Sequence, residues 1–461
     1  MAERREAQGP DRRPRRGPRW VAFEVLRTVA DADAYANLIL PQRIRDAGLD
    51  ERDAALATEL TYGTLRRLGY YDRIITLAAD RDTSRIDPAA LDLLRLGAHQ
   101  LLGMRVAPHA AVKETVALVR KESARGFVNA VLRRIAAEDR DTWLAATLAG
   151  VTSGEEALSI QYAHPLWIVR AMRQVLVAEG REAELESLLV ADNVPAPVAL
   201  TALPGLAAPE ELGERLSSVS PVGVLAPSGD PGVLPAVREG RARVQDEGSA
   251  LAALILSRAR PIAPGERWLD LCAGPGGKAA LLAAEAAIGG AELTANEFAP
   301  HRAELVRRAL RVFGEAAPEV VVADGVTWAD RAPAAFDRIL LDAPCTGLGA
   351  LRRRPEARWR KQPSDVAELA GLQSRLLDAA IAALRPGGLL AYVTCSPHAA
   401  ETKAIVNAAL RRHGRLRALD TQEVAQRVAV KPLDLAPGTH VQLWPHRHGT
   451  DAMFIQLLTV G

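Results

Sequence analysis

Residues 269–278 read Leu-Asp-Leu-Cys-Ala-Gly-Pro-Gly-Gly-Lys. Apolar residues from Trp268 to Leu271 predict a buried strand, and the run from Ala279 to Ala287 predicts a helix. The glycines between them therefore form a tight turn, where glycine permits positive φ and close backbone approach. The helix start after Lys278 offers free N–H groups. The glycine spacing matches neither the GxxxxGK[ST] loop of nucleotide-hydrolysing proteins nor the GxGxxG fingerprint of dinucleotide-binding proteins. The turn therefore indicates a nucleotide-type cofactor of a different class.

Further strands follow this turn, separated by a helix over 301–313 and by further intervening segments. We expect them at Ala291–Ala295, Glu319–Val322, Arg338–Leu341 and Leu389–Val393. Strands that alternate with helices predict a mostly parallel, doubly wound α/β sheet of the Rossmann-like kind. Ligands of such sheets bind at the carboxyl ends of the strands. All the candidate site residues lie at such ends.

Two acids occupy positions that suit a nucleoside. Glu297 follows the second strand and is placed to accept hydrogen bonds from a ribose diol, and Asp324 follows the third and could meet an adenine amino group. Either acid alone is more often a helix cap. Together with the glycine turn, they form the pattern of an S-adenosylmethionine (SAM) site.

Two cysteines follow the last two predicted strands. Cys345 lies in the run 342–347, Asp-Ala-Pro-Cys-Thr-Gly, and Cys395 lies in the run 394–396, Thr-Cys-Ser. The C5 carbon of cytosine is a poor nucleophile until a thiolate adds to C6, so a thiol beside a methyl donor suits methylation of C5. Asp342 is the local candidate for a hydrogen bond to N3. The spacing leaves open which cysteine attacks.

The region before the sheet divides into three parts. Residues 1–19 carry seven arginines and interleaved prolines, which predicts a disordered basic tail. Residues 20–140 show helical periodicity, with helix starts at Asp87-Pro88 and Pro108 and a break at Gly126. Residues 150–240 predict a small α+β connecting subdomain, in which His164 has a helix-start or packing role. The sheet domain then covers residues 244–461.

Composition limits the class of protein. The 461 residues carry a formal net charge of +2, and no apolar run is long enough to span a membrane. Three cysteines and no export signal indicate a reducing cytoplasm. We expect no metal, because the cysteines are scattered and His440, His446 and His448 lack ligand spacing. We interpret those three histidines as surface residues.

The motifs resemble a known family. The runs 270–278, 342–347 and 394–396 are similar to those of the RNA cytosine-5 methyltransferases, over about residues 244–460. The runs 63–67, 108–114 and 126–133 resemble the NusB family of helical RNA-binding domains. The whole chain therefore resembles the Sun, or Fmu, type, which methylates one cytosine of small-subunit ribosomal RNA.

The resemblance implies roles for individual residues. Cys395 becomes the nucleophile that adds to C6, Cys345 assists product release, and Lys278 and Asp342 face the target base. It also implies a set of SAM-binding residues: Cys272, Ala273, Gly274, Pro275, Gly276, Gly277, Lys278, Glu297, Asp324 and Asp342. Glu297 stands where the family more often has Asp, which keeps the carboxylate on a longer arm.

A basic run follows Cys345 and favours RNA as the partner. It contains Arg352, Arg353, Arg354, Arg358, Arg360 and Lys361, with Trp359 among them. We expect these side chains to contact phosphates and stack an unpaired base. The expected protein is a monomer that acts on small-subunit rRNA, without membrane or metal.

Two other functions fit parts of the sequence. A SAM-dependent amino-methyltransferase needs no thiol, and would usually carry a Pro-Pro-aromatic run where this chain has Ala343-Pro344-Cys345. An RNA-binding assembly or antitermination factor could keep a degenerate SAM fold without activity. The intact glycine turn, acids and cysteines argue against that factor.

Overall fold

The computed structural model describes residues 17–32, 34–226 and 229–461, and these form two compact units. The first unit holds the described residues up to Ala163 together with Arg354–Glu356. The second holds His164–Arg353 and Ala357–Gly461. The predicted basic tail falls almost wholly on residues 1–16, which lie outside the described residues.

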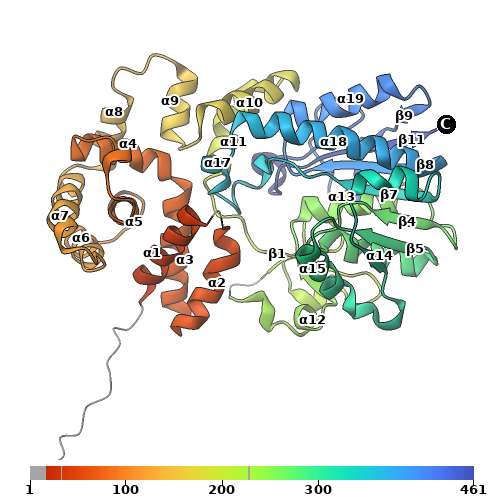
Figure 1. Cartoon of the computed structure of the whole chain (residues 1–461), viewed down its shortest axis with the longest axis horizontal. Helices are drawn as coiled ribbons and strands as arrows, with labels where there is room; N and C mark the ends of the chain where they lie inside the picture. The colour runs from red at the N-terminus through yellow and green to blue at the C-terminus, as the bar shows by residue number, and fades with distance from the viewer. Residues whose placement is uncertain (1–16, 33, 227–228) are drawn as a thin grey trace, which may run out of the picture. The chain divides into compact units, whose positions relative to one another are not determined.

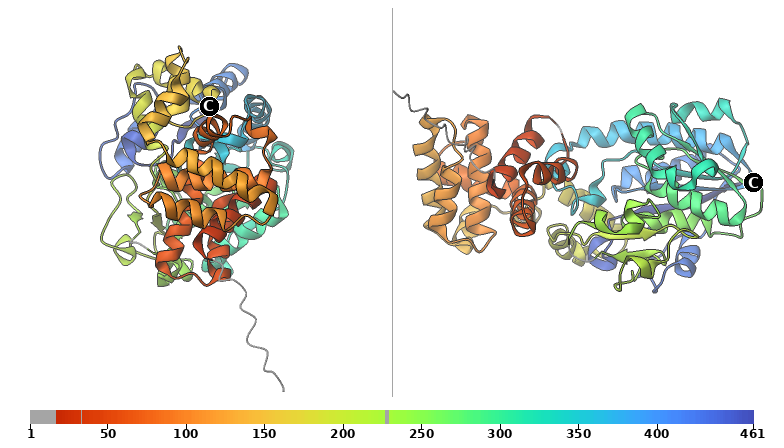
Figure 2. Two further views of the ribbon diagram at one scale, coloured as in Figure 1. Left: turned by 90° about the vertical axis from the view of Figure 1, so that its left-hand side faces the viewer. Right: turned by 90° about the horizontal axis from the view of Figure 1, so that it is seen from below.

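The first unit is built from helices, with no strand among its described residues (Figures 1 and 2). The helices are α1 (Pro18–Asp31), α2 (Ala36–Ala47), α3 (Glu51–Arg66), α4 (Leu68–Ala79), α5 (Pro88–Leu102), α6 (Pro108–Val116), α7 (Glu122–Ala136), α8 (Arg140–Leu148) and α9 (Gly154–Gln161). The all-helical prediction is confirmed.

Two of the three local signals in this unit are correct. Asp87 caps α5 by accepting hydrogen bonds from the N–H groups of Ala89 and Ala90, and Pro108 opens α6. The predicted break at Gly126 is wrong, because α7 runs through it. The helix buries Val128 and Leu132, and burial of such side chains outweighs the cost of about 1 kcal/mol for a helical glycine.

The second unit begins with a small mixed part. It contains α10 (Leu166–Ala178), α11 (Leu185–Ala191) and an antiparallel sheet in the order β2-β1-β3. The strands are β1 (Ala199–Ala202), β2 (Gly223–Leu225) and β3 (Ala242–Val244), with α12 (Pro235–Arg238) between the last two. His164 is 1% exposed, so its predicted packing role is confirmed.

A larger sheet carries the candidate site. Its strands are β4 (Arg267–Asp270), β5 (Glu292–Asn296), β6 (Glu319–Val321), β7 (Phe336–Asp342), β8 (Leu384–Thr394), β9 (Leu416–Ala418), β10 (Val441–Gln442) and β11 (Phe454–Val460). They lie in the order β10-β11-β8-β7-β4-β5-β6, with β9 on β11. Strands β4 to β8 pair in parallel, as predicted, whereas β9 to β11 form an antiparallel edge that the sequence did not reveal.

Helices cover both faces of this sheet, as a doubly wound fold requires (Figure 1). One core lies under α13 (Glu247–Ser257), α14 (Gly277–Gly289), α15 (Pro300–Leu310) and α20 (Thr421–Val428). The other lies under α16 (Trp328–Arg331), α18 (Pro363–Ala383) and α19 (Lys403–Arg412). None of the described helices combines the length and apolar character that a membrane span needs.

Candidate active site

The glycine turn joins β4 to α14. It consists of Cys272, Ala273, Gly274 and Pro275. Gly276 then comes directly before the helix, and its own φ is +107°. A Cβ at Gly276 would lie 2.5 Å from the Cβ of Ala309. Glycine is therefore required here both by backbone conformation and by the close approach of α15.

A carboxylate and a guanidinium brace this turn. Glu297, which follows β5 and is 4% exposed, accepts hydrogen bonds from the N–H groups of Gly274 and Ala299, both at 3.0 Å. Arg302 in α15 donates to the carbonyl oxygen of Gly274 at 2.6 Å. The position of Glu297 is thus fixed by backbone groups, and its oxygens keep further lone pairs for a ligand.

The second predicted acid, Asp324, is arranged differently. Asp324 follows β6, caps a short helical turn through the N–H group of Val326 at 3.0 Å, and is exposed. Nearby, the buried Asn296 donates from its amide nitrogen to the carbonyl oxygens of Leu271 and Ala323, which ties the ends of β4 and β6 together. Asp324 has both a capping role and a free approach from solvent.

A buried acid that the sequence reasoning did not assign lies beneath the turn. Asp270 ends β4 and is 1% exposed, and its carboxyl is approached by the N–H group of Cys272 but by no side-chain hydrogen-bond donor among the described residues. Burial, followed by repulsion from Asp342, raises the pKa of Asp270 to about 8, although Lys278 opposes this. A buried carboxyl without side-chain partners indicates a place that a polar ligand group completes.

These residues fit SAM. The cofactor carries a ribose diol, an adenine amino group and an amino-acid end with both charges. Glu297 and Asp324 supply acceptors at successive strand ends, the start of α14 supplies N–H groups, and Asp270 supplies a carboxyl without side-chain partners. The donor and acceptor set of the strand ends therefore matches that of the cofactor.

Lys278 and Asp342 form an ion pair between α14 and the end of β7. The ammonium nitrogen of Lys278 lies 2.8 Å from Oδ2 of Asp342, with side-chain exposures of 11% and 27%. Burial lowers the pKa of Lys278. The negative charge of Asp342, with a smaller contribution from Cys395, has the opposite and larger effect, so the pKa of the lysine is raised overall. Lys278 therefore stays a cation within electrostatic reach of the Cys395 sulfur.

The two predicted thiols meet. Cys345 and Cys395 follow the neighbouring parallel strands β7 and β8, and their Sγ atoms are 3.4 Å apart. The hydrogen bond with Cys395 and burial raise the pKa of the Cys345 thiol well above its ordinary value. Burial also raises the pKa of Cys272, so that thiol stays protonated in the turn. Cys345 is thus suited to donate a hydrogen bond to the sulfur of Cys395.

The cysteine loops are held from two sides. The N–H group of Gly349 donates to the carbonyl oxygen of Cys395 at 2.8 Å, and the N–H group of Ala452 donates to the carbonyl oxygen of Gly349 at 2.9 Å. On the other side, the buried Glu401 binds residues next to both cysteines. Sequence reasoning missed Glu401 because nothing in its local pattern distinguishes it from a helix-start acid.

The predicted RNA contacts of the basic run are wrong for three arginines. Arg352 and Arg358 are 6% and 0% exposed, and Arg353 pairs with Asp246 and Asp451. Arg352 donates to the carbonyl oxygen of Gly449. Their charges are used inside the second unit, because a buried guanidinium requires several acceptors.

The three C-terminal histidines, predicted as surface residues, are half-buried. The side chain of His446 is 7% exposed and lies 2.7 Å from a carboxylate oxygen of Glu184. His448 accepts from the N–H group of Trp444, and His440 stacks on Phe454. Each packs within the second unit, and no group of potential metal ligands was found among the described residues.

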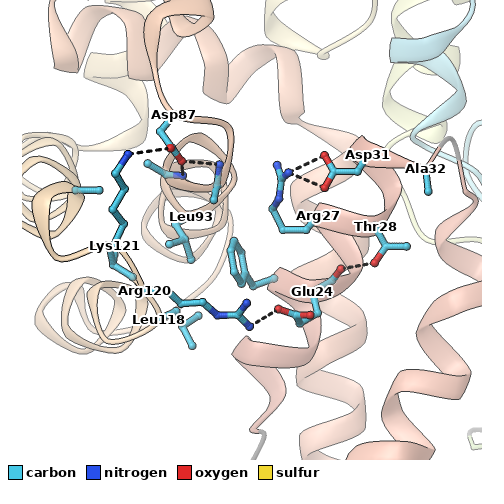
Figure 3. Close-up of a pocket in the computed structure, with 15 residues that line it drawn as sticks. Glu24, Arg27, Thr28, Asp31, Ala32, Asp87, Leu93, Leu118, Arg120 and Lys121 are labelled. Carbon is cyan, nitrogen blue, oxygen red and sulfur yellow. Dashed lines mark hydrogen bonds and ion pairs between the residues drawn. The ribbon is translucent and has the colours of Figure 1, made fainter.

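A separate pocket of about 540 Å³ lies in the helical unit, between α1, α5, the start of α7 and the segment that joins α6 to α7 (Figure 3). Its floor is apolar, and its rim carries three ion pairs: Arg27 with Asp31, Arg120 with Glu24, and Lys121 with Asp87. None of the predicted catalytic or cofactor residues lines it. Because its charges balance, the pocket carries no net attraction for an anion.

Two family models match the chain. The model described as 16S rRNA methyltransferase RsmB/F matches residues 260–459, and the NusB family model matches residues 16–137. The first match covers the glycine turn, the acids and both cysteine loops. The second covers the helices of the first unit that the resemblance predicted.

Similar proteins cover nearly the whole chain. A putative methyltransferase of Mycobacterium tuberculosis is 51% identical, with 98% of each chain covered. The ribosomal RNA small subunit methyltransferase B of Pseudomonas putida is 34% identical, over 87% of this chain and 91% of its own. The crystal structure of PH0851 has the same fold, with a TM-score of 0.79 at 22% identity, over 97% of this chain and 99% of that chain.

Proposed function

The chain belongs to the RsmB/F family of 16S rRNA methyltransferases, and from this premise we propose that it methylates C5 of a cytosine in small-subunit rRNA through a covalent adduct. One observation carries the finer part of the proposal. The two sulfurs of Cys345 and Cys395 lie 3.4 Å apart at neighbouring strand ends, beside Lys278 and Asp342. A methyltransferase that acts on an amino group has no use for such a pair.

Cys395 is the proposed nucleophile. Its thiolate forms a bond to C6 of the cytosine, and the electron pair of the C5–C6 double bond makes C5 nucleophilic. The Lys278 ammonium favours that thiolate by its positive charge. Asp342, held by Lys278 at 2.8 Å, is the candidate to accept a hydrogen bond from N3 once that nitrogen is protonated, and so to stabilise the adduct.

Cys345 is the proposed group for product release. Once C5 has taken the methyl group, a base removes the C5 proton, the C5–C6 double bond forms again, and the C6–sulfur bond breaks to release Cys395 as a thiolate. The Cys345 thiol, protonated because burial and its neighbour raise its pKa, can hydrogen-bond the departing Cys395 sulfur. This assignment rests on the resemblance of the two motifs to the family.

The cofactor is S-adenosylmethionine. It supplies an electrophilic methyl group on a sulfonium sulfur when bound. We assign its binding to residues 272–278 with Glu297, Asp324 and Asp342, and the buried Asp270, which has no side-chain partner, supports that placement. A cytosine inside a duplex is out of reach, so the target base must be unpaired or flipped out.

The test uses small-subunit rRNA and SAM with a labelled methyl group. Wild type, Cys395→Ala and Cys345→Ala are incubated and run on a denaturing gel. Cys395→Ala should lose methylation because no thiolate adds to C6. Cys345→Ala should accumulate a protein–RNA adduct because release slows.

Methylation by Cys395→Ala at the wild-type rate would overturn the cytosine-5 proposal and favour transfer to an amino group. Binding of SAM by a wild type that labels no RNA would instead favour a non-enzymatic RNA-binding factor. Nucleoside digestion of the labelled RNA identifies the methylated base in either case.

A further inference from the structure

Glu401 is a buried acid that the steps above do not use. It ends a short helical turn after β8, and its side chain is 0% exposed. An isolated charge is costly to bury, so a buried carboxylate requires hydrogen-bond donors. The donors of Glu401 come from both cysteine loops.

Four hydrogen bonds reach its carboxylate. Oε1 accepts from the N–H group of Thr346 at 2.8 Å and from the amide of Gln373 at 3.1 Å. Oε2 accepts from the hydroxyls of Thr346 at 2.5 Å and Ser396 at 2.6 Å. An ionised carboxylate can only accept hydrogen bonds, and all four of these groups donate. This set of donors therefore suits the charged form of Glu401.

Three of the four hydrogen bonds come from the residues that directly follow the two thiols. Thr346 follows Cys345, and Ser396 follows Cys395, so one carboxylate joins the two loops. Gln373 strengthens the link, because its amide also donates to the carbonyl oxygen of Pro344 at 2.8 Å, on the other side of Cys345. The backbone on each side of Cys345 is thereby fixed to the loop of Cys395.

We propose that Glu401 is a positioning residue that sets the separation of the two thiols. This inference rests on the proposed function for its consequence, because the Cys345 thiol must reach the Cys395 sulfur as that sulfur leaves C6. Glu401 itself touches neither the base nor the cofactor in this role. Loss of the link lets the loops separate while the glycine turn, Glu297 and Asp324, which make no contact with Glu401, are unchanged.

The geometry can be tested without RNA or SAM. Phenylarsine oxide condenses with two neighbouring thiols to form one cyclic dithioarsinite and one water, so its affinity reports how well the pair is held. Thr346→Val removes one hydroxyl at nearly constant volume, Thr346→Ser restores it, and Glu401→Gln removes the charge. Thr421→Val is the matched control, since that buried hydroxyl accepts from the N–H group of Leu457 elsewhere in the sheet.

We expect Glu401→Gln and Thr346→Val to lower arsenical affinity at least tenfold and to lower kcat for methylation with the KM for SAM unchanged. Thr346→Ser should recover most of both losses, and Cys345→Ser should show no dithiol binding. Thr421→Val should lower the melting temperature without affecting the arsenical. Wild-type arsenical affinity and kcat in folded Thr346→Val would overturn the inference.

Failure of the proposed function gives a different result. If wild type does not methylate cytosine C5 but arsenical affinity still falls in Thr346→Val and returns in Thr346→Ser, the positioning role stands without the chemistry. If wild type methylates and the variants change neither readout, the chemistry stands and the positioning role is wrong.

Discussion

The two halves of the candidate site are built in different ways. The cofactor half, residues 270–278 with Glu297 and Asp324, consists of a glycine turn and acids that are fixed mainly by nearby backbone groups. The thiol half, residues 343–349 and 394–401, is held by hydrogen bonds between loops that lie about fifty residues apart in the chain. Residues that bind the ligand therefore lie within local sequence motifs. Residues that hold the reacting groups together can lie far apart in the sequence and outside any motif.

This comparison predicts that damage to one half leaves the other half intact. Variants of the thiol half should lose methylation with SAM binding preserved. Variants of the cofactor half should lose SAM binding with thiol geometry preserved.

The largest effect is expected for Gly349→Ala in the thiol half. The new Cβ would lie 2.0 Å from the carbonyl oxygen of Ala452 and 2.8 Å from that of Cys395, so backbone must move. A displacement of about 1 Å at a reacting group can reduce the rate on the order of 100-fold. Methylation should fall by that factor in a single-turnover assay, while SAM affinity measured by calorimetry stays within twofold. Loss of both together would show that the halves are not independent.

A smaller effect is expected for Gly276→Ala in the cofactor half. The substitution forces a side chain into φ +107° and against Ala309, and such strain is of order 1–3 kcal/mol. The Kd for SAM should rise roughly tenfold to a hundredfold, since about 1.4 kcal/mol is one power of ten. Gly314→Ala is the control, because its φ is also positive but nothing lies within 4 Å of its Cβ. Equal SAM affinity in the Gly276 variant would contradict the assigned turn.

Next in size is Glu297→Gln. The amide keeps the shape but weakens acceptance from Gly274 and Ala299, and hydrogen bonds to charged groups contribute about 1.5–3 kcal/mol. We expect the Kd for SAM to rise about tenfold and arsenical binding by the cysteines to stay at the wild-type level. Asp324→Asn should have a smaller effect, because Asp324 is exposed. A larger effect for Asp324 would reverse the relative importance of the two acids.

The smallest effect concerns stability. The pKa of Asp270 is raised to about 8 from 3.8, so the folded protein keeps this proton while the unfolded chain loses it. Stability from this group is therefore complete below pH 4 and declines as pH rises toward 8. The side chain of Asp270→Asn does not titrate. Without SAM, the melting temperature of the variant minus that of wild type should therefore increase by a few degrees from pH 4.5 to pH 8.5. Parallel melting curves across that range would show that Asp270 is not protonated in the fold.

Much of the sheet could be predicted because its signals are local. The strand before Gly274, the helix after Lys278 and the acids at strand ends all follow from short patterns of apolar residues and glycine. The edge strands β9 and β10 could not be predicted, since they span three and two residues, too few for an alternating pattern. Strand β11 pairs with β8, which lies tens of residues away along the chain, and β9 and β10 pair in turn with β11.

Charges were the least predictable part of the site. Arg358 stands in a basic run that is typical of a solvated or RNA-binding segment, yet its guanidinium is buried on Asn193 and Asp192. Glu401 stands in an ordinary helix-start pattern but joins two loops. In both cases the partners come from distant parts of the chain, so sequence spacing carries no information about the pairing.

Strand β11 has a consequence for how the protein is made. It pairs with β8 from Phe454↔Thr394 to Thr459↔Leu389, and Ala452 holds the Gly349 loop just before it. A chain leaving the ribosome can therefore complete its glycine turn more than a hundred residues before the strand beside Cys395 has been synthesised. Catalytic competence is thus the last property that the nascent chain acquires, and messages cut short before residue 452 yield a protein that lacks these supports of its thiol pair.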